Sequence, residues 1–353
     1  HESLSYSISK IFKYCPRVDQ LKFNQVVTKK RDYKDELEFE VSNAIYNDDF
    51  GNALCAFCTL KKNLISLSEL QAAGIDIESI PDQTINSING QLIIDWPWKD
   101  PKTKTVFSAG TKFVREPRLD SKNKFGVKFL NRTKDSKFEI VNSKIPKNIC
   151  ITKFASSENG KIDNFVKILI KWAANFDNQN GFIPYVWGGN SFRELYLKDK
   201  FELFESTCDD ACYWKRTCEN SLKKPHCGFD CSNLIKTAAQ MAGINYIIKN
   251  TSTLINSKIY QVRSREKIHK GDIICYSGHV VAVIDPEENL IVEAAGYGVG
   301  HGKVQIIPIS KAYKGINKLE DLLIIKPIYR LNNLGEISGR AIAEVKIFRF
   351  IGL

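Results

Sequence analysis

The stretch Gly228-Phe229-Asp230-Cys231-Ser232-Asn233-Leu234 places a cysteine at the start of a predicted helix. Apolar residues recur at helical spacing from Leu234 to Ala242, and Gly243 supplies a C-terminal stop. Unpaired backbone N–H groups and the positive end of the helix dipole favour a thiolate over a thiol. The sequence therefore predicts that Cys231 is a nucleophile at a helix N-terminus.

Two apolar runs farther along the chain carry the groups that such a nucleophile needs. His279 begins the predicted strand 279–284, and Glu293 interrupts the predicted strand 290–295. A buried carboxylate without a partner is costly, so we expect Glu293 to pair with the histidine, although His301 could take the same place. A cysteine, a histidine and a polar orienting group are the parts of a base-activated thiol nucleophile.

Length and composition indicate a globular protein of two or three domains. The chain has 353 residues, of which 43% are hydrophobic and 26% charged. It contains no apolar run of about 18 residues, so we expect no membrane span. The net charge of +11 favours anionic surroundings such as nucleic acid, phospholipid or a cell wall. Because no zinc-finger spacing or aromatic nucleic-acid-binding motif occurs, we expect no nucleic-acid partner.

Ten cysteines are many for a chain that stays in a reducing compartment. One close pair is Cys55 and Cys58, and four more crowd into a polar stretch at Cys208, Cys212, Cys218 and Cys227. In an exported protein, cysteines clustered in this way predict disulfides that stabilise an insertion too polar to have a hydrophobic core of its own. A zinc cluster is the competing interpretation, but the spacings match no familiar finger or ribbon. We therefore expect neither a metal nor a cofactor.

The hydrophobic period changes near residue 160 and divides the chain. Before it, short alternating runs separated by turns predict two small β-barrels, at 1–80 and 86–150. After it, apolar residues at helical spacing from Ile162 to Phe176 begin an α+β domain. This domain is predicted to cover 160–331, with the cysteine-rich insertion at about 190–227. The tail 332–353 ends in an apolar stretch that could add a strand.

Four motifs in a fixed order resemble those of the NlpC-type cysteine peptidases of bacterial cell walls. They are Pro184–Gly189, Phe229–Ser232, Gly271–Asp272 leading to Gly278–Val280, and Val292–Ala294. The likeness covers about 162–331 and implies a papain-like catalytic domain preceded by two SH3-like barrels. It also implies cleavage of peptidoglycan stem peptides or muropeptides, often between D-glutamate and the diamino acid.

The resemblance assigns a role to each matching residue. Cys231 is the nucleophile, His279 the general base and later acid, and Glu293 the third polar residue that orients the imidazole. The Cys231 backbone N–H and the Tyr185 hydroxyl would meet the oxyanion. The residues expected to bind substrate are Tyr185, Trp187, Asp230, Ser232, Thr251 and Ser252, of which Asp230, Thr251 and Ser252 lie where some members hold a free L-alanine ammonium. The chain departs from the family at Asn233, where glycine is usual, and in its long insertion.

Three functions are compatible with these residues. The leading one is a secreted or periplasmic peptidase, whose signal peptide would have been removed from a chain that begins at His1. An amidase or acyltransferase would use the same cysteine and histidine on another amide. A catalytically silent wall-binding or host-binding module would use the barrels and the basic surface instead.

Overall fold

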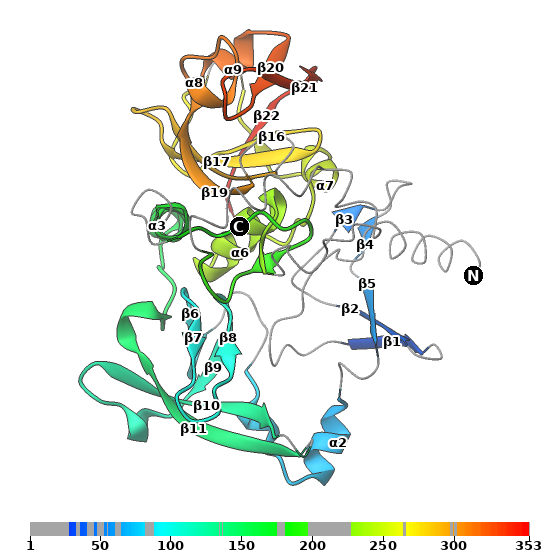
Figure 1. The fold of residues 1–353 in the computed structure, drawn as a ribbon, viewed down its shortest axis with the longest axis vertical. Helices are drawn as coiled ribbons and strands as arrows, with labels where there is room; N and C mark the ends of the chain where they lie inside the picture. Colours follow the sequence, from blue (N-terminus) through cyan, green and yellow to red (C-terminus); the bar gives the residue numbers. More distant parts are fainter. Residues whose placement is uncertain are drawn as a thin grey trace. The chain divides into compact units, whose positions relative to one another are not determined.

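The structure is a computed structural model that describes most of the chain. The described residues are 28–32, 36–40, 46–47, 53–54, 56–60, 65–81, 88–133, 135, 137–174, 181–196, 227–263, 266–296, 299 and 302–352. They form a mixed α/β protein with mostly antiparallel sheets and few helices (Figure 1). The chain divides into two compact units. The α/β unit comprises His1–Gln20, Ile45–Leu54 and Ala155–Leu353, and the β unit comprises Leu21–Ala44 and Cys55–Phe154.

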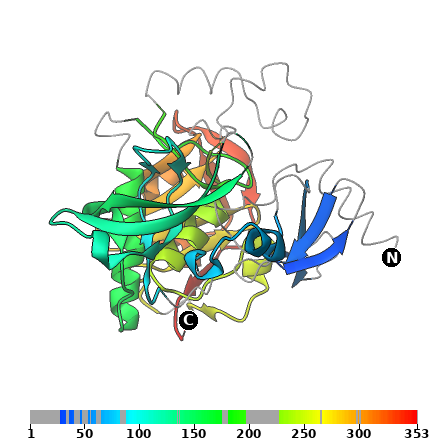
Figure 2. The same cartoon turned by 90° about the horizontal axis from the view of Figure 1, so that it is seen from below.

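The β unit is built on a five-stranded antiparallel sheet in the order β11-β10-β9-β6-β12. The strands are β6 (Gln91–Ile94), β9 (Lys112–Arg115), β10 (Lys124–Arg132), β11 (Phe138–Pro146) and β12 (Cys150–Ile151). The β10–β11 hairpin is the longest element of this unit (Figure 2). The rings of Trp98, Phe107, Phe113 and Phe129 are buried together, with Trp98 stacked on Phe107 and Phe107 edge-on to Phe113 and Phe129. Aromatic pairs of this kind add to the stabilisation that comes from burying apolar area.

The β unit also contains several shorter elements. They are the three-stranded sheet of β1 (Thr28–Asp32), β2 (Glu36–Glu40) and β5 (Ala56–Leu60), the pair β7 (Trp98–Lys99) and β8 (Val106–Phe107), and helix α2 (Leu67–Ala72). Helix α2 begins with a capping box between Ser66 and Glu69.

The described strands of the β unit do not close into the predicted barrels. Strand β11 pairs only with β10, and β12 pairs only with β6, so the five-stranded sheet keeps two edges. Closing a barrel would require the edge strands β11 and β12 to pair with each other, and β12 has only two residues. The segment 1–80, predicted as one barrel, is itself divided. The short pair β3 (Tyr46–Asn47) and β4 (Ala53–Leu54) belongs to the α/β unit, where β3 lies beside helix α7 (Thr251–Ile255).

The α/β unit contains a six-stranded antiparallel sheet in the order β15-β22-β16-β17-β18-β19. Its strands are β15 (Tyr260–Gln261), β22 (Lys346–Arg349), β16 (Ile273–Tyr276), β17 (His279–Asp285), β18 (Leu290–Ala295) and β19 (Lys303–Pro308). Helices α3 (Glu158–Ala173) and α6 (Cys231–Met241) pack against one face, over β17 to β19 (Figure 1). The segment predicted as a tail therefore supplies β22, a strand inside the sheet.

The opposite face of this sheet is covered by the chain between β19 and β22. This cover consists of α8 (Ile309–Ala312), α9 (Asp321–Ile324), β20 (Ile328–Leu331) and β21 (Ile337–Ile342). Its apolar side chains form one buried cluster with Val281, Val283 and Ile291 of the sheet. Glu293 follows Ile291 by two residues, so it points toward the same cover.

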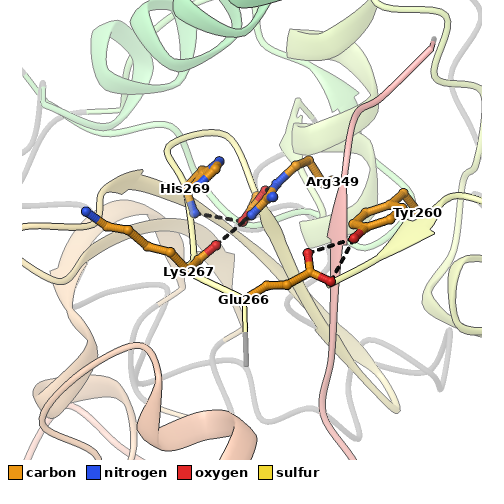
Figure 3. Close-up of polar contacts among 6 residues, drawn as sticks. Tyr260, Glu266, Lys267, His269 and Arg349 are labelled. Carbon is orange, nitrogen blue, oxygen red and sulfur yellow. Dashed lines mark hydrogen bonds and ion pairs between the residues drawn. The ribbon is translucent and has the colours of Figure 1, made fainter. Parts of the chain in front are cut away.

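An ion pair fixes β22 to the beginning of β16. Arg349 donates to both carboxylate oxygens of Asp272, at 2.8 and 2.7 Å, and to the carbonyl oxygen of Lys267 at 2.8 Å (Figure 3). Beside it, the Tyr260 hydroxyl donates to Glu266 at 2.7 Å. Bidentate arginine–carboxylate pairs are both strong and geometrically specific. The aspartate of the Gly271–Asp272 motif thus has an anchoring function in this chain.

The described cysteines form no disulfide. Cys150, Cys227, Cys231 and Cys275 are free thiols. Cys227 was expected to join the stapled cluster, but its expected partners Cys208, Cys212 and Cys218 lie outside the described residues, as do the side chains of Cys55 and Cys58. None of the described helices is long and apolar enough to cross a membrane.

Candidate active site

Cys231 is the first residue of helix α6, as the sequence predicts, and it is only 8% exposed. Asp230 is the N-cap residue and its Oδ1 accepts the backbone N–H of Asn233 at 2.7 Å. Its Oδ2 accepts the backbone N–H of Gly188 at 2.9 Å. The carboxylate therefore caps the helix and holds the preceding turn beside the cysteine. Its predicted contact with a substrate ammonium stays a prediction.

Backbone hydrogen bonds join the turn of the Pro184–Gly189 motif to the segment that precedes Cys231. The Val186 N–H donates to the Phe229 carbonyl oxygen at 3.0 Å, and the Asp230 N–H donates to that of Gly189 at 3.0 Å. Strands β13 (Asn190–Ser191) and β14 (Gly228–Phe229) continue this pairing. Motifs about 40 residues apart in the sequence are thereby brought together around the sulfur.

Gly228 is required because of this close approach. A Cβ atom at this position would lie 2.1 Å from the Pro184 carbonyl oxygen. We expect Gly228→Ala to push the turn away from Cys231 and to lower kcat/KM by about 100-fold, since small displacements at a reacting centre have effects of that size. Gly74→Ala controls for a general loss of stability, because it strains a φ of 76° while its Cβ meets nothing within 4 Å. Steady-state kinetics would show equal activity in both variants if the packing at Gly228 were unimportant.

His279 and Glu293 form the predicted hydrogen bond. The His279 Nε2 atom lies 2.9 Å from the Glu293 Oε2 atom. The register Ala282↔Val292 makes the two residues diagonal neighbours on one sheet face, within reach of long side chains. The Cys231 side chain also interacts with His279 and raises the pKa of its imidazole. Because Nε2 is directed at Glu293, Nδ1 is the ring nitrogen left for the sulfur.

Two residues that the sequence analysis did not select hold Glu293. Gln305, its direct partner on β19, donates from Nε2 to Oε1 at 2.9 Å. Arg330 of β20 forms an ion pair with the same oxygen. Like Glu293, Arg330 is a charged residue inside an apolar strand, so the argument that a buried charge needs a partner could have identified it. The side chains of Cys231, His279, Glu293 and Arg330 form one chain of contacts.

Burial and neighbouring charges act in opposite directions on these groups. Burial alone raises the pKa of the Glu293 carboxyl, but Arg330 and the hydrogen bond from His279 hold it well below its usual range. Burial lowers the pKa of His279, whereas its hydrogen bonds to Cys231 and Glu293 raise it to about 9. Glu293 is therefore ionised and His279 protonated at neutral pH.

The raised pKa of His279 predicts an alkaline limit to activity. In the role that the sequence analysis expects, the imidazolium donates a proton to the leaving group, so kcat/KM should fall as pH rises through about 9. Glu293→Gln removes the charge that favours the imidazolium and should move this limb to lower pH. The pH profiles of both proteins test this, with the exposed Glu288→Gln as a control. An unmoved limb in Glu293→Gln would contradict the assignment.

A cleft of about 910 Å³ opens beside His279 within the α/β unit. Of the residues predicted to bind substrate, Tyr185 and Trp187 line it. Its other lining residues are Ile255, Tyr276, Ser277, Gly278, Gly296, Val299, Arg330, Ser338, Gly339, Arg340, Ala341, Ile342, Ala343 and Glu344. A volume of this size suits a short peptide.

The remaining predicted residues lie outside the lining of this cleft. Ser232 follows the nucleophile, with its Oγ 3.9 Å from the sulfur. The Thr251 Oγ1 accepts the Gly278 N–H at 3.3 Å, next to His279, and the Ser252 Oγ lies 3.2 Å from the Asn250 Oδ1. His301, the alternative to Glu293, lies outside the described residues. The described part of the chain holds no group of three or more potential metal ligands.

Comparison with known proteins gives no relative. A scan against protein-family models matches none of them, and a search of curated proteins finds no match.

Proposed function

We propose that this chain is a cysteine hydrolase with a papain-like catalytic domain. The observation that carries this proposal is the His279–Glu293 hydrogen bond next to an open cleft, with the Cys231 side chain interacting with the same imidazole. A cysteine at a helix N-terminus, a histidine within hydrogen-bond reach and a carboxylate that orients the histidine are the parts of a nucleophilic acyl-transfer site.

Within that class, we propose that the substrate is a peptidoglycan stem peptide, cut between D-glutamate and the diamino acid. The support is the ordered set of motifs from Pro184 to Ala294, of which Pro184–Gly189 is hydrogen-bonded to the segment before Cys231 and, with Gly278 and His279, contributes to the cleft lining. We further propose that the protein is exported and that its N-terminal sheets derive from SH3-like domains that hold the wall. A free L-alanine end of the peptide would be bound near Asp230.

The proposed reaction has two steps. The Cys231 thiolate attacks the amide carbon, and the resulting oxyanion is met by the Cys231 backbone N–H at the helix end. The His279 imidazolium gives its proton to the leaving nitrogen, the C–N bond breaks and a thioester remains. Neutral His279 then takes a proton from water as the oxygen attacks the thioester. The products are a carboxylic acid and the regenerated thiolate, while Glu293 stabilises the imidazolium throughout.

Incubation with purified muropeptides tests this function. We expect mass spectrometry to show two fragments whose masses sum to that of the substrate plus one water, and no fragments from Cys231→Ala. Absence of fragments from the unaltered protein would overturn the peptidase. A product that carries an added amine in place of water would assign the chain to acyl transfer instead.

A further inference from the structure

A distortion of the β20–β21 hairpin presents an arginine to the active-site cleft. The hairpin pairs Ile328 with Ile342 and Arg330 with Ser338, so two steps along β20 face four steps along β21. The extra residues of β21 include Arg340, and Gly339 before it has a φ of 80°. Bulges of this kind redirect a side chain and often occur beside active sites. Here the bulge places Arg340 in the lining of the same cleft as His279.

Arg340 carries the one charge of the cleft lining that has no counter-charge in the described residues. The buried Arg330 is paired with Glu293, which also holds His279. Glu344 lies 3.8 Å from Lys346. Arg340 is exposed, and its side chain makes no hydrogen bond or ion pair with any described residue.

A second arginine, Arg330, adds to the positive potential near Arg340. Arg330 is only 6% exposed and lines the cleft, and its Nη1 atom has no hydrogen-bond partner among the described residues. Arg330 lies opposite Ser338, two residues from Arg340, so both guanidinium groups come from one hairpin.

We propose that Arg340 forms an anion subsite that binds a carboxylate of the peptide substrate. This inference rests on the proposed function and narrows its substrate to peptides with a free carboxylate near the scissile amide. A guanidinium presents a planar pair of donors that matches a carboxylate, and Arg340 is free to do so. In the proposed stem peptide, the carboxylate belongs either to the glutamyl residue or to the diamino acid.

Calorimetry on the Cys231→Ala protein tests the subsite without turnover. The probes are L-alanyl-γ-D-glutamyl-diaminopimelate with free carboxylates, and two versions with either the glutamyl or the diaminopimelate carboxylate amidated. We expect Arg340→Gln to raise the Kd of the free peptide by about two- to fivefold, which corresponds to the upper part of the range for an exposed ion pair. Amidation of the carboxylate that binds Arg340 should raise the Kd by the same factor as Arg340→Gln does. The Kd of the Arg340→Gln protein for the amidated peptide should be no higher than with either change alone. Arg340→Lys should be intermediate.

The outcomes separate this inference from the proposed function. Arg193→Gln, an exposed arginine outside the cleft lining, is the matched control and should leave all three Kd values unchanged. Arg340→Gln that weakens the three peptides equally, or none of them, overturns the subsite even if the unaltered protein cleaves. Failure to bind any of them also overturns it. Arg340-dependent binding without cleavage by the unaltered protein supports the subsite and rejects the peptidase.

Discussion

Replacing Cys231 by alanine is expected to lower kcat by a factor of at least about 10⁴, because the proposed thioester forms on this sulfur. The change removes one sulfur atom from the first turn of α6 and leaves the cap at Asp230 and the His279–Glu293 pair in place. We therefore expect substrate peptides still to bind. Loss of turnover with retained binding is the result that distinguishes a nucleophile from a structural thiol.

Cys275 provides the matched control for this prediction. It is a second free thiol, fully buried on β16, and burial raises the pKa of its thiol. Cys275→Ala should keep its activity, apart from a loss of stability typical of removing a small buried group. Iodoacetamide should label Cys231 first, as peptide mapping would show, since the thiolate is the reactive form. Equal activity of Cys231→Ala and Cys275→Ala would exclude Cys231 as the nucleophile.

Local patterns are sufficient to predict the elements that carry the site. The helix Cys231–Met241 begins and ends close to where its capping residue and apolar spacing place it, and the strands that carry His279 and Glu293 have the predicted limits to within a residue. These signals are local, because caps and periodicity are properties of a few neighbouring residues. The contact between His279 and Glu293 could also be anticipated, since a buried carboxylate requires a partner.

Features that depend on the order of strands could not be predicted in the same way. Arg330 is 37 residues from Glu293 in sequence, and only the folding of the cover over the sheet brings them together. Strand β22 was expected as an optional addition, yet it lies between β15 and β16. The predicted barrels rested on strand length and spacing, which do not state whether the end strands pair. The bulge at Arg340 likewise depends on the register between β20 and β21.

Replacing Arg330 by methionine is expected to lower the free energy of unfolding by about 3–5 kcal/mol, the cost of breaking a buried ion pair. The reason is that Glu293 is fully buried and, among the described residues, would keep Gln305 and His279 as its hydrogen-bond partners. The low pKa of Glu293 depends on Arg330, so the carboxyl should also bind a proton at higher pH in the variant. Urea denaturation at neutral pH measures the first effect.

The double variant Arg330→Met with Glu293→Gln separates stability from catalysis. Removing both charges leaves no uncompensated ion, so the double variant should be more stable than Arg330→Met alone. Its activity should nevertheless stay low, because a neutral amide in place of the Glu293 carboxylate would no longer stabilise the His279 imidazolium. Additive losses of stability would show that Arg330 and Glu293 are not energetically coupled. Recovery of stability without recovery of kcat would show that the Arg330–Glu293 pair serves the chemistry of His279. The fold would then be equally stable with uncharged side chains at these two positions.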